Sequence, residues 1–176
     1  NPFNKTPRKV CTANGHYDII DLETLPDDYL PRTNYRPMPD RAEYLRRTPR
    51  VSWLEPGEKQ SRSVTEFFRL SHRKLLGPSG ERTFIACVSV PGTTHIFNAP
   101  TITFRSIEDL IGVLSFSISL LCDFFVKSTG AAAFTASSAK LLPMLGTENR
   151  APIAARALAL NCLTTHYAPL WEQVYD

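Results

Sequence analysis

The chain has 176 residues, of which 43% are hydrophobic, and its net charge is +3. This length allows one domain with a real core, and the hydrophobic content excludes a generally disordered chain. The 14 prolines, most of them before residue 100, predict a turn-rich first half rather than long helices. We expect an arm or linker over residues 1–16 and one domain over residues 17–176.

The charge is distributed unevenly along the chain. Residues 32–82 hold twelve Lys and Arg against six Asp and Glu, whereas residues 83–176 hold five against six. A basic half beside an apolar half is typical of a nucleic-acid-binding surface backed by a packing module. The alternative is a solvated charged face that binds nothing.

The first half predicts short elements. Polar and apolar residues alternate enough over residues 17–22 to predict a short strand or turn. Residues 40–47 predict two helical turns capped by Asp40. Residues 51–54 are compatible with a strand. Residues 65–76 predict a strand with basic residues at alternating positions.

The second half predicts a sheet with packed helices. Residues 83–90 form a nearly continuous apolar run that predicts a buried strand, and residues 95–104 predict a further strand. A helix is expected over residues 106–127, capped by Ser106, and another over residues 151–167. Pro169 opens a last helical stretch. The predicted class is α+β, with a mixed or antiparallel sheet, packed C-terminal helices and an irregular, Pro-rich N-terminal segment.

The helix over residues 106–127 is expected to supply much of the core. The spacing of its apolar residues predicts five buried side chains: Leu110, Val113, Leu114, Ile118 and Leu121. Asp123 and Lys127 are expected near its polar end. The apolar run 110–126 within it is about 17 residues long, whereas a bilayer span needs about 20. We therefore expect a core helix and no membrane partner.

The cysteines do not show the spacing of a zinc site. They are isolated in the sequence: Cys11, Cys87, Cys122 and Cys162. We expect reduced, mostly buried thiols in a cytoplasmic protein, and no metal site.

Five segments occur in an order that resembles one protein family. They lie at residues 28–35, 68–73, 81–86, 123–130 and 160–171. In that order the chain resembles the target-recognition region of large single-chain adenine-specific DNA methyltransferases from bacterial restriction-modification and phage-defence systems. The resemblance covers residues 17–171.

The resemblance implies two partners, double-stranded DNA and the catalytic domain of the same polypeptide. In the family, that domain carries a glycine-rich S-adenosylmethionine loop and an Asn-Pro-Pro-aromatic motif, and this sequence contains neither. The resemblance therefore implies that S-adenosylmethionine binds the parent enzyme elsewhere. For this chain we expect no catalytic residue and no cofactor.

Arginine suits DNA because its guanidinium group binds phosphate or guanine through two hydrogen bonds. The candidate DNA-binding residues are Arg46, Arg47, Arg50, Arg69, Arg73 and Lys74. Alternatively, Arg69 and Arg73 are structural partners of nearby carboxylates. For Arg82, in a Glu-Arg-Thr turn, the structural role is expected.

The second hypothesis is a protein-interaction or scaffolding module that docks to other parts of the same polypeptide through its apolar C-terminal helices. Salt-dependent binding to duplex DNA would favour the first hypothesis, and indifference to DNA the second. A nuclease would need clustered carboxylates beside a lysine, which the sequence offers only poorly.

Overall fold

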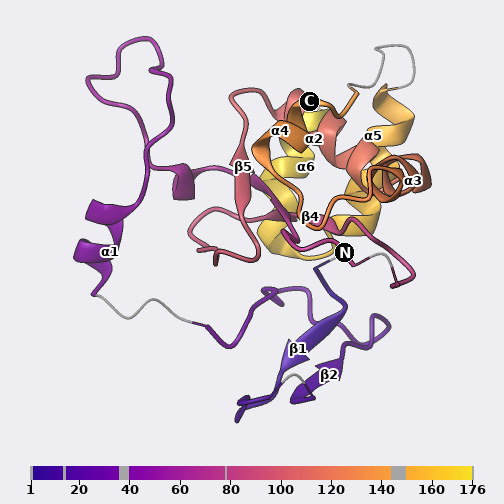
Figure 1. Cartoon of the computed structure of the whole chain (residues 1–176). Coiled ribbons are helices and arrows are strands. Elements are labelled where there is room, and N and C mark those ends of the chain that lie inside the picture. The colour runs from indigo at the N-terminus through magenta and orange to yellow at the C-terminus, as the bar shows by residue number, and fades with distance from the viewer. Residues whose placement is uncertain (1, 14, 36–39, 78, 144–149, 176) are drawn as a thin grey trace.

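The computed structural model describes residues 2–13, 15–35, 40–77, 79–143 and 150–175. Within these residues, two small antiparallel sheets and six α-helices make up an α+β fold, as predicted. Figure 1 shows α2 to α6 gathered on one side, the smaller sheet below them and, to the left, a long excursion of the chain that carries α1.

The smaller sheet belongs to the N-terminal segment. β1 (Lys5–Pro7) pairs antiparallel with β2 (Tyr17–Ile19), so residues 5–7 form a strand where an arm or linker was expected. Phe3 is fully buried against the rings of Tyr29 and Tyr167, and this packing fixes the segment to the body of the protein.

The larger sheet has the strand order β4-β3-β5, formed by β3 (Arg69–His72), β4 (Ala86–Ser89) and β5 (Thr101–Thr103). The strand predicted over residues 83–90 forms only over Ala86–Ser89, and along it buried and half-buried residues alternate instead of being buried throughout. Ala86 and Val88 face the core, whereas Cys87 and Ser89 point the other way.

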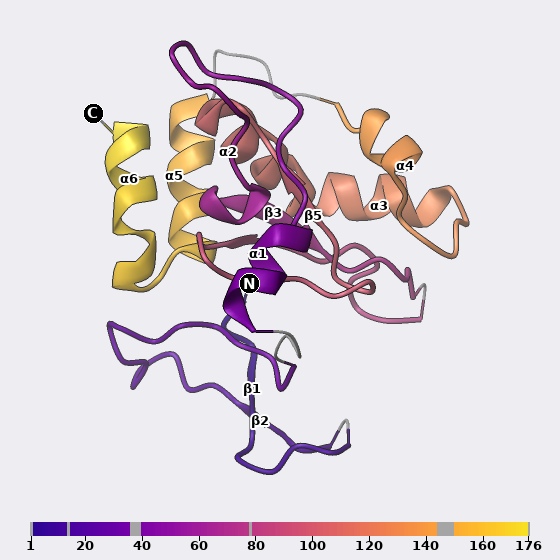
Figure 2. The same cartoon turned by 90° about the vertical axis from the view of Figure 1, so that its left-hand side faces the viewer.

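The apolar face of this sheet packs on α2 (Ile107–Ser117). Ser106 caps α2 as predicted, accepting a hydrogen bond from the backbone N–H of Asp109. Behind α2 lie α5 (Arg150–Asn161) and α6 (Ala168–Tyr175), and Figure 2 shows the three helices side by side. Leu110, Leu114 and Leu158 are fully buried between these layers.

The prediction of a single helix over residues 106–127 is wrong. The chain leaves α2 at Ile118 and begins α3 (Leu120–Ser128) after a bend of 71°. Ser119 caps α3 by accepting from the N–H of Cys122, which gives the new helix its own start. Because of the bend, Leu121 is 74% exposed, not buried as predicted.

Asp123 fixes the direction of α3. Its Oδ1 accepts hydrogen bonds of 2.8 Å from the backbone N–H groups of both Thr83 and Phe84. Arg82 lies 3.6 Å from the same oxygen and donates to the carbonyls of Ile118 and Ser119 at the bend. The structural role expected for Arg82 is therefore confirmed.

The remaining helices are short: α1 (Arg41–Arg47), the 3-10 turns Val64–Glu66 and Thr165–Tyr167, and α4 (Ala136–Lys140). No single helix among the described residues is both long and apolar enough to cross a bilayer. α2 and α3 pass that test only when taken together across their bend.

Leu114→Ala should lower the free energy of unfolding by about 2–5 kcal/mol, because it opens a cavity in a fully buried layer. Leu121→Ala is the matched control, and its effect should stay within about 0.5 kcal/mol because Leu121 is exposed. Chemical denaturation of the two variants measures both values. Equal losses would contradict the division between α2 and α3.

The stability should also fall in mild acid because of His72. Its buried ring packs 4.9 Å from that of Phe134, and burial lowers the pKa of His72 below 6.5. The unfolded chain therefore takes up a proton before the folded one does. The free energy of unfolding should decrease as the pH falls below about 6.5.

His72→Gln should make this pH dependence shallower, although it also weakens the fold at neutral pH. A part should remain, because burial and the charge of Arg69 lower the pKa of His95 as well. Denaturation midpoints at several pH values test this expectation. An unchanged slope in His72→Gln would rule out His72 as a source of the acid sensitivity.

Candidate nucleic-acid interface

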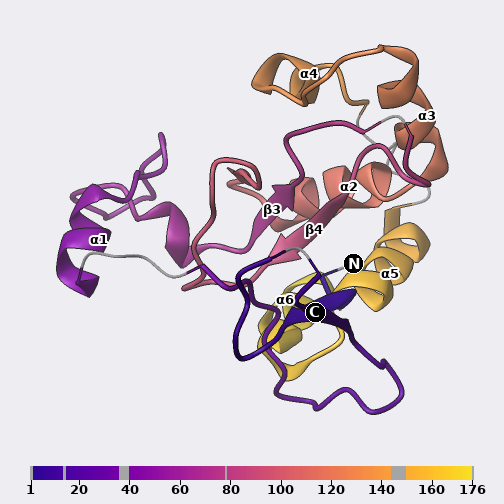
Figure 3. The same ribbon diagram turned by 60° about the horizontal axis from the view of Figure 1, so that its bottom comes forward.

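The segment 40–66, here called the arm, projects from the body and holds six Lys and Arg against five Asp and Glu. It leaves the body through α1 and returns beside itself, with Val51 N–H bonded to the carbonyl of Arg62 and Val64 N–H to that of Pro49. In Figures 1 and 3 it lies to the left of the helical body. Only Val51 and Thr65 are buried within it, and its other side chains are half-buried or exposed.

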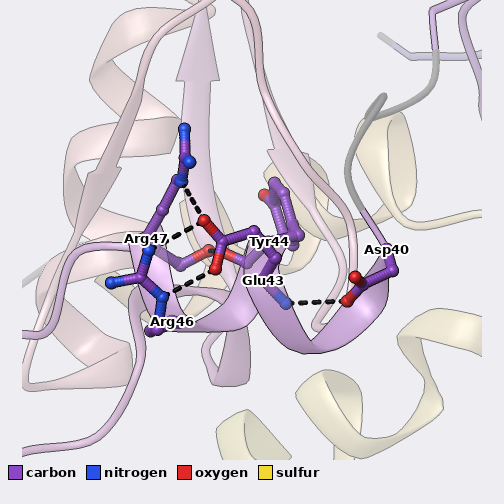
Figure 4. Close-up of polar contacts among 6 residues, drawn as sticks. Asp40, Glu43, Tyr44, Arg46 and Arg47 are labelled. Carbon is purple, nitrogen blue, oxygen red and sulfur yellow. Dashed lines mark hydrogen bonds and ion pairs between the residues drawn. The ribbon is translucent and has the colours of Figure 1, made fainter.

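α1 is held by local polar contacts, because none of its residues is buried. Asp40 caps it as predicted, accepting from the N–H of Glu43 at 2.9 Å. Glu43 then binds both following arginines, Arg46 through Nε and Nη2 at 2.6 and 2.8 Å and Arg47 through Nε at 2.5 Å (Figure 4). The pairs have the i,i+3 and i,i+4 spacings that face each other on a helix.

One carboxylate shared by two guanidinium groups leaves a local excess of positive charge. The hydrogen bonds from Arg46 and Arg47 hold the pKa of Glu43 below its ordinary value, so this carboxylate is ionised at neutral pH. The side chains of Arg46 and Arg47 are still 70% and 68% exposed. Both guanidinium groups are thus open to solvent, and a phosphate can compete with Glu43 for them.

Other contacts shape the rest of the arm. Arg50 donates from Nη1 to the carbonyl of Ser61 across the arm, and Arg62 lies over the ring of Phe67 at 4.7 Å. At the far loop, Arg105 binds Glu55 with two hydrogen bonds of 3.1 Å. This pair connects the loop to the chain just before α2.

Arg69 does not share the surface of the other candidates. It stands on β3 but is fully buried, with Nη2 donating to the carbonyl of Thr93 at 2.6 Å and to its hydroxyl at 3.1 Å. Burial lowers the pKa of Arg69, although a guanidinium stays charged at neutral pH. Its described partners are oxygens of neutral groups, not the carboxylates of the structural alternative.

Arg73 and Lys74 follow the end of β3 on the body of the protein. Arg73 is exposed, and its Nε donates to the carbonyl of Leu75 at 2.7 Å. The Nζ atom of Lys74 lies 3.3 Å from the ring centroid of Phe97. The predicted strand over residues 65–76 is therefore shorter than expected, and it does not carry the three basic residues as one row.

The candidate residues thus form two groups, and a groove that none of them lines lies between the arm and the body. The arm carries Arg46, Arg47 and Arg50, and the body carries Arg73 and Lys74. The groove has a volume of about 940 Å³ and is lined by Arg41, Tyr44 and Arg62 from the arm and by residues 91–92 and Thr94 from the body. Both walls of such a groove can contact one ligand.

Two interactions that organise the arm were not predicted from the sequence, the Glu43 cluster and the pair of Arg105 with Glu55. Glu43 was detectable, because a glutamate three and four residues before two arginines indicates helical ion pairs. The pair of Arg105 with Glu55 joins residues 50 positions apart, and no local pattern in the sequence predicts it.

Among the described residues, no group of three or more His, Cys, Asp or Glu could hold a metal ion. All four cysteines are free; Cys122 and Cys162 are buried, whereas Cys11 and Cys87 are half-buried. Comparisons with protein-family models, with curated proteins and with solved structures found no match.

If the arm contacts DNA, Glu43→Gln should raise its affinity for duplex DNA severalfold at low salt, because the substitution releases both arginines from a competing carboxylate. Fluorescence anisotropy with a labelled duplex measures this. Glu172→Gln on α6 is the matched control, since it removes the same charge from an exposed position away from the arginine cluster. Equal effects would mean that only net charge matters.

Proposed function

We propose that this chain is a DNA-binding target-recognition module of an adenine-specific DNA methyltransferase of the restriction-modification or phage-defence type. The arm and the end of β3 contact duplex DNA, and a catalytic domain of the same polypeptide modifies the base. The chain supplies no residue to that chemistry. S-adenosylmethionine belongs to the catalytic domain, because this sequence lacks the glycine-rich loop that would hold it.

The observation that carries this proposal is the pair of exposed guanidinium groups on α1. They project from the body on a segment with few buried side chains, and both stay largely exposed although they share one carboxylate. Phosphate contacts are made by such accessible cationic side chains. Arg50, Arg73 and Lys74 add positive charge on the arm and on the body. Arg69 is not used, because it is buried.

A second candidate function, docking to another protein surface, is favoured by α3. Three large side chains on this helix are 74–75% exposed: Leu120, Leu121 and Phe124. Grouped apolar exposure of this kind marks interaction sites on folded proteins. The two functions are compatible, since α3 would bind the catalytic domain while the arm binds DNA.

The affinity for duplex DNA should fall with salt, with a slope of log affinity against log salt of about −0.9 for each phosphate neutralised. Arg47→Gln should flatten this slope by about 0.9 and weaken all sequences alike, because a phosphate contact carries no sequence information. Arg156→Gln on α5 is the control, since it removes an exposed arginine far along the chain from the arm.

Charge reversal of Arg46, Arg47 and Arg73 together should abolish most of the binding. Unchanged affinity and slope in this triple variant would rule out the DNA-facing assignment. If the chain also self-associates through α3, and Leu121→Ser prevents this, the docking function is the one to adopt.

A further inference from the structure

A second cavity lies beside Lys74, on the body of the protein. Its volume is about 680 Å³, which falls within the usual range of ligand pockets. The walls come from the end of β3, the loop before β5, α2 and α4. They include three aromatic rings, those of Phe97, Phe104 and Phe134.

The charged residues of this cavity all have one sign. Lys74 and Lys140 line it, together with His72 and His95, and no Asp or Glu appears among its described lining residues. Lys140 is exposed at the end of α4. An apolar, aromatic cavity with ammonium groups suits a ligand that has a flat ring system and a negative charge.

Phe97 stands at this cavity in an unusual position for a phenylalanine. Its side chain is 77% exposed, although it lies in a short turn closed by the N–H of Ala99 bonding the carbonyl of Ile96. The turn is tied to the body because Lys74 N–H bonds the carbonyl of Asn98 at 2.9 Å. With the Lys74 ammonium 3.3 Å from its centroid, the ring is held in place while open to solvent.

Nucleic acid offers the matching chemistry. Every base has a flat face that stacks on an aromatic side chain, and the phosphates beside it are attracted by lysine. A purely apolar peptide would gain nothing from the lysines and a purely acidic one nothing from the rings, whereas each nucleotide carries a flat ring and a negative charge together. A base inside a duplex is already stacked on both faces, so the cavity suits a base that is unpaired.

We propose that this cavity binds an unpaired nucleobase of DNA, which stacks on Phe97, while Lys74 and Lys140 contact the adjoining phosphates. The inference rests on the proposed function and adds to it a site that reads the local structure of DNA rather than its charge. Phe97 is a binding residue in this assignment, and it takes no part in methyl transfer.

The test compares two short duplexes that differ by a single unpaired adenine, each titrated with the whole chain. The wild-type chain should bind the duplex with the unpaired base about fivefold more tightly or better, which is the lower end of what one base–aromatic stack contributes. Phe97→Leu keeps an apolar side chain but removes the ring, so this preference should disappear. Its salt slope should stay unchanged because no charge is lost.

Tyr175→Leu is the matched control, since Tyr175 is also an exposed aromatic residue but lies on α6 outside the cavity. It should keep the wild-type preference. Lys74→Met should instead flatten the salt slope.

A wild-type chain that binds both duplexes equally, or a Phe97→Leu variant that keeps the preference, overturns the nucleobase site and leaves the proposed DNA binding standing. Failure to bind either duplex overturns both proposals.

Discussion

The packing of α2 against the three-stranded sheet is the interaction on which the rest of the structure depends. The sheet is small, and one of its faces is polar, so its apolar face needs a helix to cover it. Leu110 and Leu114 of α2 are fully buried there, and the opposite side of the same helix receives α5 and α6. Since α2 contacts both layers, it joins the sheet to the C-terminal helices as one core.

Polar contacts then decide how the peripheral elements leave this core. Asp123 accepts from two backbone N–H groups just before β4, and this holds α3 at an angle to α2. A buried carboxylate with two such partners is well satisfied, so the bend costs little. The same bend turns Leu120, Leu121 and Phe124 away from the core and creates the apolar face of α3.

The arm, unlike the core, is held mainly by polar contacts and not by buried side chains. α1 has no buried residue, and the contacts that hold it are its cap and the Glu43 cluster. The rest of the arm is held by backbone hydrogen bonds across it, by the contact of Trp53 with Phe67 and by the pair of Arg105 with Glu55. Exposed ion pairs contribute little to stability. The basic groups on the arm are thus carried by a segment with few buried side chains, whereas the cavity beside Phe97 lies on the body.

Local signals in the sequence determined a large part of this fold. The caps at Asp40 and Ser106, the last helix around Pro169, the strand near Tyr17 and the α+β class all follow from side-chain chemistry within a few residues. The excess of Lys and Arg over residues 32–82 could also be read from the composition.

Only the tertiary structure decided which of those charges face solvent. Arg69 and Arg73 are four residues apart, yet one is buried and the other exposed, because a side chain's burial depends on what packs over its strand. The break between α2 and α3 likewise depends on Asp123 meeting Thr83 and Phe84, which lie 40 and 39 positions away. Periodicity within one segment cannot report such a contact, since it records which residues are apolar and not which distant groups they meet.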